Sequence, residues 1–340
     1  MAIYYPGLKG QEFVGNRGFV VERILELRRE LLKQLPRKTL DRNLIVGSWN
    51  LRDFGRQPGH GFNPEERMPE SYYYIAQIID AFDVVAVQEI NENMSDFKKV
   101  MSILGKHYDY IATDVTEGVS GNGERMTFIY DTRKVTFQNI AGEVVLPAGK
   151  DAITQFARTP FVVSFQCGWL KFDLCTAHLY YGEDSGAKKA RRVQEISDLG
   201  EFMMKRAVKS QTNTFILGDF NVVGPNDETW KALVDSGFAM PEAIKNIRTN
   251  IDEEKYYDRI AFASVRSEVT FADPQPGGSF RFFDYVFRDR DEAHYKALAK
   301  NMNLPFRKWA TWQMSDHLPL WVQMETDFAE TYLGKVALVP

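Results

Sequence analysis

Hydrophobic residues in this chain occur in two alternating patterns. Short runs rich in Val, Ile and Phe, each bounded by polar residues, lie at 44–46, 84–87, 128–130, 161–166, 171–177 and 214–217. Runs of this length and composition predict buried strands. Because the runs alternate with segments of helical periodicity, the chain is predicted to be an α/β protein.

The helical segments show apolar residues at three- and four-residue steps. The clearest is 17–35, where Val20, Ile24 and Leu27 share one face and Pro36 ends the helix. Further helices are predicted at 71–81 (with Ser71 as its cap), 94–104, 187–208, 230–235 and 292–301. We expect the first helix to pack onto the domain. A dimer contact or another partner is the alternative.

Seven short polar motifs accompany the strand-like runs, each predicted to follow a strand. They are Ser48-Trp49-Asn50, Gln88-Glu89-Ile90, Glu124-Arg125, Thr176-Ala177-His178, Gly218-Asp219-Phe220-Asn221, Tyr257-Asp258-Arg259-Ile260 and Ser315-Asp316-His317. Strand ends that converge at one sheet edge can build a single site from distant residues. Carboxylates, two histidines and two asparagines suit metal-assisted attack on a phosphate.

The order of these motifs resembles the endonuclease/exonuclease/phosphatase superfamily, and within it the deoxyribonuclease I-like branch, over residues 44–322. The resemblance implies an α/β fold in which two packed mixed β-sheets, flanked by helices, form a four-layer sandwich. It leaves residues 1–43 as an N-terminal helical extension, 44–325 as the catalytic domain and 326–340 as a tail.

The resemblance also implies a metal site for Mg²⁺ or Mn²⁺. Glu89 is the expected main ligand, Asp316 the second carboxylate and Asn50 a neutral oxygen nearby. Magnesium prefers hard oxygen ligands, usually one or two carboxylates together with water and substrate phosphate. Taken alone, Glu89 is better explained as a carboxylate that caps the following helix, and a turn residue is the alternative for Asn50.

Two acid–base pairs are implied by the same resemblance, His317 with Asp258 and His178 with Glu124. A carboxylate bonded to one imidazole nitrogen fixes the tautomer, so that the other nitrogen can exchange a proton with water or the leaving group. Which histidine is the acid and which the base stays open.

The turn after the run at 214–217 carries two further candidates, Asp219 and Asn221. Asn221 is expected to stabilise charge on the phosphoryl oxygens, and Asp219 to orient water or the leaving group or to contact the metal. An Asx turn is the alternative for Asn221.

Other residues suggest contacts with nucleic acid, each with a simpler alternative. Arg158 is expected to contact the substrate phosphate, or else to form a surface ion pair. A basic cluster could hold a nucleic-acid backbone, or form a solvated helix face; its members are Lys188, Lys189, Arg191 and Arg192. Trp309 and Trp312 could stack bases, although a core role is favoured.

Two departures from the family bear on duplex DNA. Relatives that cut duplex DNA carry an Arg two residues after the metal Glu and a Tyr two residues before the Glu-Arg motif. Asn91 and Asn122 stand at those positions here. Engagement of the duplex minor groove is therefore not expected from the motifs.

Composition narrows the class of protein. The chain has 340 residues, of which 44% are apolar and 26% charged, which argues against disorder and a coiled coil. A net charge of −4 does not exclude nucleic acid, because phosphate contacts need only a local basic patch. Neither a signal peptide nor an apolar run of the ~20 residues needed to span a membrane is predicted, so we expect a cytoplasmic location.

The two cysteines fit that expectation. In the predicted hairpin Cys167 faces Leu170 and not Cys175, which disfavours a disulfide between them. Free buried thiols suit a reducing compartment.

These features predict a metal-dependent phosphodiesterase, most simply a nuclease acting on DNA or RNA. A phosphatase or phospholipase-type enzyme with a non-nucleic substrate is the alternative. The inositol-phosphatase branch is disfavoured, because Tyr256-Tyr257 and Val222-Val223 stand where that branch carries Trp-Cys and Arg. A catalytically inactive binding module is disfavoured because no key residue is missing.

Overall fold

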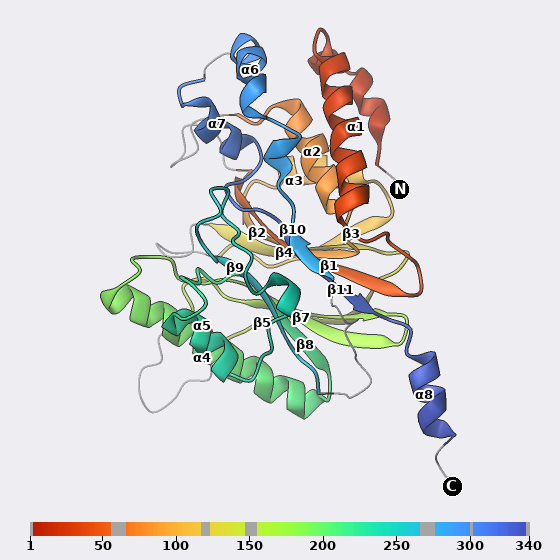
Figure 1. The fold of residues 1–340 in the computed structure, drawn as a ribbon, viewed down its shortest axis with the longest axis vertical. Coiled ribbons are helices and arrows are strands. Elements are labelled where there is room, and N and C mark those ends of the chain that lie inside the picture. The colour runs from red at the N-terminus through yellow and green to blue at the C-terminus, as the bar shows by residue number, and fades with distance from the viewer. Residues whose placement is uncertain are drawn as a thin grey trace.

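Two β-sheets pack face to face, and helices cover their outer faces (Figure 1). This architecture comes from a computed structural model that describes residues 3–55, 66–116, 123–146, 155–265, 276–299 and 302–337. The four-layer sandwich of two mixed sheets expected from the motifs is confirmed.

The first sheet has six strands in the order β10-β11-β1-β2-β4-β3. Their bounds are β1 Asn43–Phe54, β2 Val84–Asn91, β3 Tyr108–Ala112, β4 Glu124–Asp131, β10 Gly277–Ser279 and β11 Leu320–Glu325. β1 and β2 are parallel, and the other neighbours are antiparallel.

The second sheet has five strands in the order β5-β6-β7-β8-β9. Their bounds are β5 Thr136–Glu143, β6 Phe161–Cys167, β7 Leu170–His178, β8 Asn213–Asp219 and β9 Asp258–Ala263. β7 and β8 are parallel, whereas the other pairs are antiparallel. Each sheet therefore brings one parallel pair to the centre of the fold.

Both faces of the central strands are apolar, which explains their continuous hydrophobic runs. In β1, Leu44 and Val46 enter the core between the sheets, where they join Phe165 and Leu174 of the second sheet. Ile45 points the other way, into the cluster beneath the helices. Successive side chains of a strand face opposite sides, so a strand buried on both sides needs no polar alternation.

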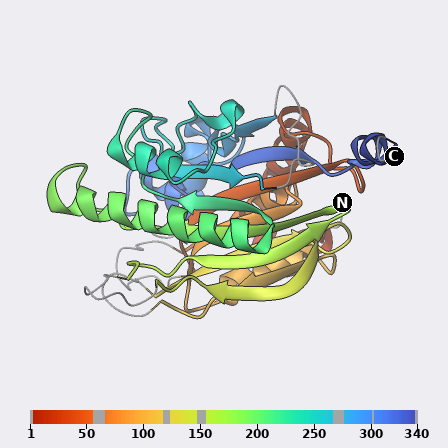
Figure 2. The same cartoon turned by 90° about the horizontal axis from the view of Figure 1, so that it is seen from below.

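Helices cover the six-stranded sheet on one side and the five-stranded sheet on the other. The first group is α1 Arg17–Gln34, α2 Pro69–Ile79, α3 Ser95–Leu104, α6 Glu292–Leu298 and α7 Phe306–Gln313. The second group is α4 Gly186–Ser210 and α5 Glu228–Asp235. Figure 2 shows α4, in green, lying along its sheet. α8 (Ala329–Val336) buries no residue and projects from the body in Figure 1.

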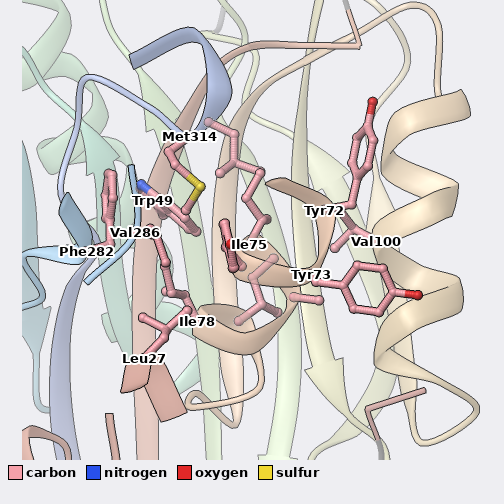
Figure 3. Close-up of a cluster of buried hydrophobic side chains, with 14 of the residues drawn as sticks. Leu27, Trp49, Tyr72, Tyr73, Ile75, Ile78, Val100, Phe282, Val286 and Met314 are labelled. Atoms are coloured by element: carbon pink, nitrogen blue, oxygen red, sulfur yellow. The ribbon is translucent and has the colours of Figure 1, made fainter. Parts of the chain in front are cut away.

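The N-terminal helix α1 is part of the core. Its residues Val20, Ile24 and Leu27 are buried in the same cluster as Trp49 of β1, and Figure 3 shows Leu27 in that cluster with Ile78 of α2. Each fully buried side chain of this size contributes ~1.5–3 kcal/mol relative to exposure. Packing onto the domain, the simpler of the two expectations for this helix, is confirmed.

Several predicted bounds need correction. The helix predicted at 71–81 begins at Pro69, so Ser71 is its third residue rather than its cap. Proline suits this start because its missing N–H has no partner in the first turn of a helix. The strand-like run at 44–46 extends to Phe54 in β1, and residues 56–65 lie outside the described residues.

Short regular elements occupy parts of the stretch 261–314. It contains the end of β9, then β10, α6 and α7. α6 lies within the helix predicted at 292–301, whereas α7 was not predicted; with 8 residues, its apolar periodicity is a weak signal in sequence.

The two cysteines are free and buried, and Cys167 pairs with Leu170 as predicted. Among the described residues, no helix is long and apolar enough to cross a membrane.

Candidate active site

The polar motifs meet at one edge of the two sheets. Four strands carry a candidate at or near their C-terminal ends: Asn50, Glu89, His178 and Asp219. The prediction that every motif follows a strand is wrong elsewhere, since Glu124 opens β4, Asp258 opens β9 and His317 precedes β11. Those strands run antiparallel to their neighbours, so their N-terminal ends lie at the same edge as the other C-terminal ends.

A cavity of ≈ 730 Å³ opens at this edge. Most predicted site residues line it: Glu89, Glu124, Arg158, His178, Asp219, Asn221, Asp316 and His317. The remaining two, Asn50 and Asp258, lie behind the lining and hydrogen-bond to Glu89 and His317 respectively. The structure therefore brings every predicted site residue into one place.

Gly218 sets the distance between the parallel strands β7 and β8 at this edge. Its φ is +135°, and a Cβ at this position would lie 2.0 Å from the backbone oxygen of Ala177. The close approach places Asp219 directly across from His178 in the strand register. Only glycine fits both the backbone angle and the space.

We expect Gly218→Ala to destabilise the fold by ~2 kcal/mol or more, because it combines backbone strain with a clash against main chain that cannot move away. Gly224→Ala is the matched control, since nothing lies within 4 Å of a Cβ added there. Urea unfolding at equilibrium measures the free energy of unfolding of both variants. Equal midpoints for the two variants would contradict the steric role of Gly218.

Glu89 is held in a strained conformation that aims its carboxylate at the cavity. Its φ is 63°, and the pairing of β2 with β4 shifts register between Val87 and Ile90. One carboxylate oxygen accepts a hydrogen bond from Nδ2 of Asn50 at 2.7 Å, and the other accepts from the backbone N–H of Asp53 at 2.7 Å. A non-glycine residue in this region of φ is uncommon and is typical of functional positions.

The first histidine pair joins the two sheets. Nδ1 of His178, at the end of β7, lies 2.7 Å from Oε2 of Glu124, at the start of β4. Burial and the nearby Arg158 lower the pKa of His178, but Glu124 and Asp219 outweigh them, and the net shift is upward. The pair predicted from the motifs is confirmed in its geometry.

The second pair is built in the same way. Nδ1 of His317 lies 2.8 Å from Oδ2 of Asp258, and both residues are buried. The backbone carbonyl of His317 accepts a hydrogen bond from the indole of Trp49 at 2.9 Å. Ser315 fixes the preceding turn, since its hydroxyl donates to the carbonyl of Asn50 at 2.6 Å and accepts from the N–H of His317. The Ser-Asp-His motif is thus anchored to β1.

Asp219 lies between the two imidazoles. Its Oδ2 is 3.6 Å from Nε2 of His178 and 3.7 Å from Nε2 of His317. Nδ2 of Asn50 donates to the same oxygen at 3.2 Å. Both histidines therefore turn their free nitrogens toward one buried carboxylate, and the pKa of His317 rises well above its usual range because Asp258 and Asp219 outweigh the effect of burial.

The donor set fits a hard divalent cation at Glu89. Ligand atoms of Glu89, Glu124 and His178 lie within 4.8 Å of one another. Glu124 and His178 already bond to each other, so Glu89 is the carboxylate of this group that is not hydrogen-bonded to a histidine. Burial raises the pKa of Glu89 to about 7, and the neighbouring Glu124 adds to the rise. A bound cation would offset both the burial of this carboxylate and its repulsion from Glu124.

The other expected ligands differ in their placement. Asp316 lines the cavity and lies 3.4 Å from Nη1 of Arg52. Asn50 donates its amide to Glu89, and its carboxamide oxygen accepts from the backbone N–H of Arg52 at 2.9 Å. In this arrangement Asn50 orients the Glu89 carboxylate and does not present its oxygen to the cavity.

Asn221 and Arg158 border the reacting centre. Asn221 has φ 52° and donates its side-chain amide to the carbonyl of Leu179 at 3.1 Å. Arg158 is buried, with Nε 3.1 Å from Oε2 of Glu124, and therefore does not form a surface ion pair.

The basic cluster at the start of α4 is neutralised by ion pairs. Lys188 pairs with Glu183 at 3.0 Å, and Lys189 with Asp227 at 2.6 Å. Arg192 is fully buried and donates to backbone carbonyls. These ion pairs do not support the expectation that the cluster holds a nucleic-acid backbone. The sequence could not show the pairs, because the spacing of the basic residues does not reveal which carboxylates lie opposite them.

Comparison with known proteins gives structural matches only. No protein-family model matches the chain, and no curated protein sequence matches it. An endonuclease/exonuclease/phosphatase family protein from Bacteroides thetaiotaomicron has a TM-score of 0.53 at 20% identity, covering 84% of this chain and 98% of that one. The chain has the endonuclease/exonuclease/phosphatase fold.

Two further structures share this fold. The mannosyl-6-phosphatase of Bacteroides thetaiotaomicron VPI-5482 has a TM-score of 0.52 at 20% identity, covering 83% of this chain and 99% of that one. The human Nocturnin catalytic domain has a TM-score of 0.54 at 15% identity, covering 83% of this chain and 94% of that one.

Within this endonuclease/exonuclease/phosphatase fold, the cavity has lining residues that the motifs did not predict. Arg52 follows Asn50 by two residues, and φ values of 48° and 47° at Arg52 and Asp53 turn the chain into the cavity. Its guanidinium lies 3.9 Å from the ring centroid of Trp312 and donates to Thr311. Trp312 is therefore a buried support, and so is Trp309. In the sequence, only its place two residues after Asn50 could have indicated that Arg52 lies at the site.

Proposed function

We propose that the chain is a metal-dependent phosphodiesterase and that its substrate is a nucleic acid, DNA or RNA. One observation carries the proposal: two imidazoles, each oriented by its own buried carboxylate, face Asp219 from different sheets in a cavity that also holds Glu89. Displacement at phosphorus needs a proton taken from the attacking water and one given to the leaving oxygen, and two oriented histidines supply both.

Each side chain has a role that follows from its position. His317 and His178 exchange the two protons through their Nε2 atoms, while Asp258 and Glu124 hold their tautomers. Asp219 orients the water or leaving group between them, and Asn221 and Arg158 favour negative charge on the phosphoryl oxygens. Glu89 and Asp316 would hold Mg²⁺ or Mn²⁺, which when bound lowers the pKa of water and neutralises phosphoryl charge.

Cations on one wall of the cavity support a polyanionic substrate. Arg52, Arg307 and Lys308 line the cavity along with the catalytic residues, and the first two also pair with Asp316 at 3.4 Å and Asp289 at 3.6 Å respectively. Lys308 is exposed and has no ion-pair partner among the residues that the structure describes. A phosphodiester chain presents further phosphates beyond the one that is cut, and a cationic wall next to the reacting centre complements them.

A phosphomonoesterase is the competing function, because the mannosyl-6-phosphatase shares the fold at 20% identity. The deciding experiment offers the purified protein, with Mg²⁺ or Mn²⁺, single- and double-stranded DNA, RNA, bis(p-nitrophenyl) phosphate and mannose 6-phosphate. Cleavage of nucleic acid is expected, with loss in excess EDTA. A Glu89→Gln preparation serves as the control for contaminating nuclease. Activity confined to the monoester would reject the proposal.

The salt dependence of binding locates the phosphate contacts. We expect Lys308→Gln to flatten the log–log plot of affinity against salt by roughly 0.7–0.9, the contribution of one phosphate contact. Lys188→Gln is the matched control and is expected to leave the slope unchanged, because Nζ of Lys188 lies 3.0 Å from Glu183. Fluorescence anisotropy with a labelled oligonucleotide between 50 and about 200 mM salt measures the slope. A larger change in slope for Lys188→Gln than for Lys308→Gln would instead assign the phosphate contact to α4.

A further inference from the structure

An exposed tyrosine stands at the rim of the cavity. Tyr181 lies in the segment between β7 and α4 and lines the same cavity as His178. It is 54% exposed, one of the larger aromatic exposures in the part of the chain that the structure describes. The Arg192 guanidinium lies 5.9 Å from the centroid of this ring, and the exposed part of the ring is available to a ligand that enters the cavity.

The backbone that carries this ring is fixed on both sides. The N–H of Tyr180 donates to Oε2 of Glu195 at 3.0 Å. The buried guanidinium of Arg192 donates to the carbonyls of Tyr180 and Glu183, each at 3.1 Å. The ring of Tyr181 is therefore presented to solvent from an anchored segment, which is the preorganisation that a binding surface requires.

A second ring connects this surface to the reacting centre. Tyr257 lies edge-on to Tyr181, with ring centroids 6.2 Å apart and an interplanar angle of 89°. Tyr257 also lies near the imidazole of His317, with ring centroids 5.8 Å apart. The two tyrosines thus form an aromatic wall that runs outward from His317, and the cationic residues Arg307 and Lys308 line the same cavity.

We propose that Tyr181 stacks against an unpaired nucleobase next to the scissile phosphate, so that the enzyme prefers single-stranded over double-stranded nucleic acid. The inference rests on the proposed function and specifies its substrate. Aromatic side chains combined with a cationic surface are typical of single-strand binding, since every base has a π-face. In a duplex both faces of a base are covered by its neighbours, which leaves none for Tyr181.

The test compares substrates that differ by one base. A single-stranded oligonucleotide with one cleavable linkage is compared with the same strand lacking the base on either side of that linkage. Tyr181→Ala is expected to lower kcat/KM on the intact strand by roughly 5- to 150-fold, the range for one lost base–aromatic stack. The loss on the matching abasic strand should be at least several-fold smaller. Tyr181→Trp should retain the preference for the base.

Tyr332→Ala is the matched control, because Tyr332 is 47% exposed on α8 and contacts Trp169 away from the cavity. It should change neither kcat/KM nor the ratio between the strands. Equal losses on intact and abasic strands in Tyr181→Ala, with the fold intact by thermal melting, would overturn the stacking role alone. Failure of the unaltered protein to cleave any nucleic acid would overturn the proposed function as well.

The relative rate of cleavage of single and double strands is the second test of the proposal. The unaltered protein should cleave a single strand faster than the same strand in a duplex, and Tyr181→Ala should narrow that difference. A preference for the duplex would overturn the inference. Stronger hydrolysis of a sugar phosphate than of any oligonucleotide, reduced by Tyr181→Ala, would assign the ring to a sugar and overturn the nucleobase assignment.

Discussion

Glu89→Gln is expected to lower kcat/KM by about 10³-fold or more while the fold stays intact. The change removes the charge of a cavity carboxylate that both Asn50 and the Asp53 backbone orient. A metal ion contributes several kcal/mol of charge stabilisation to displacement at phosphorus, and each ~1.4 kcal/mol is a factor of ten in rate. Turnover of an oligonucleotide with saturating Mg²⁺ gives the measurement.

A control variant and a binding measurement further test the role of Glu89. Glu92→Gln, a change of the same type at an exposed carboxylate in the loop after β2, should have near-normal activity. Calorimetric titration with Mn²⁺ should show weaker binding to Glu89→Gln than to the unaltered protein. Full activity of the unaltered protein in excess chelator would remove the metal from the proposal.

Replacing either histidine should lower turnover by ~10²–10⁴, the usual contribution of a positioned acid or base. His178→Ala and His317→Ala each remove an imidazole whose Nε2 lies within 3.7 Å of Asp219. The double variant should lose far less than the product of the two single losses, because both groups serve one displacement. Single-turnover kinetics separate this effect from changes in product release.

The control for the histidine variants is His107→Ala, which changes a histidine in the turn before β3. It should leave turnover unchanged. Near-normal turnover in His178→Ala would remove the Glu124–His178 pair from the chemistry, and the same outcome in His317→Ala would remove Asp258–His317.

Much of the fold could be predicted from local patterns. The continuous runs at 84–87 and 214–217 lie in strands buried on both faces, and the helix at 17–35 packs its predicted apolar face into the core. β3, β5, β9, β10 and β11 were not assigned from the pattern. β5 is mostly exposed and β10 has three residues, so neither shows a strong alternation of apolar and polar side chains.

The sequence by itself determined the set of chemical groups. The motifs named both histidines and their carboxylates, and all of the predicted site residues meet at one edge of the sheets. Their partners are distant in sequence, and only the order of the motifs, matched to a family, indicated the pairs. The motifs identified the candidate site residues because a strand followed or preceded by a polar turn is a local feature of the sequence.

The tertiary structure alone decided which charges and rings face the cavity. It placed Asp219 between the two imidazoles and turned Asn50 toward Glu89. It also paired the lysines of α4 with acids, and placed Lys308 and Tyr181 at the cavity. These contacts depend on the packing of one sheet on the other and on the paths of loops. Neither is encoded in the spacing of residues along a strand or helix, because each contact joins segments whose relative positions are set by the whole core.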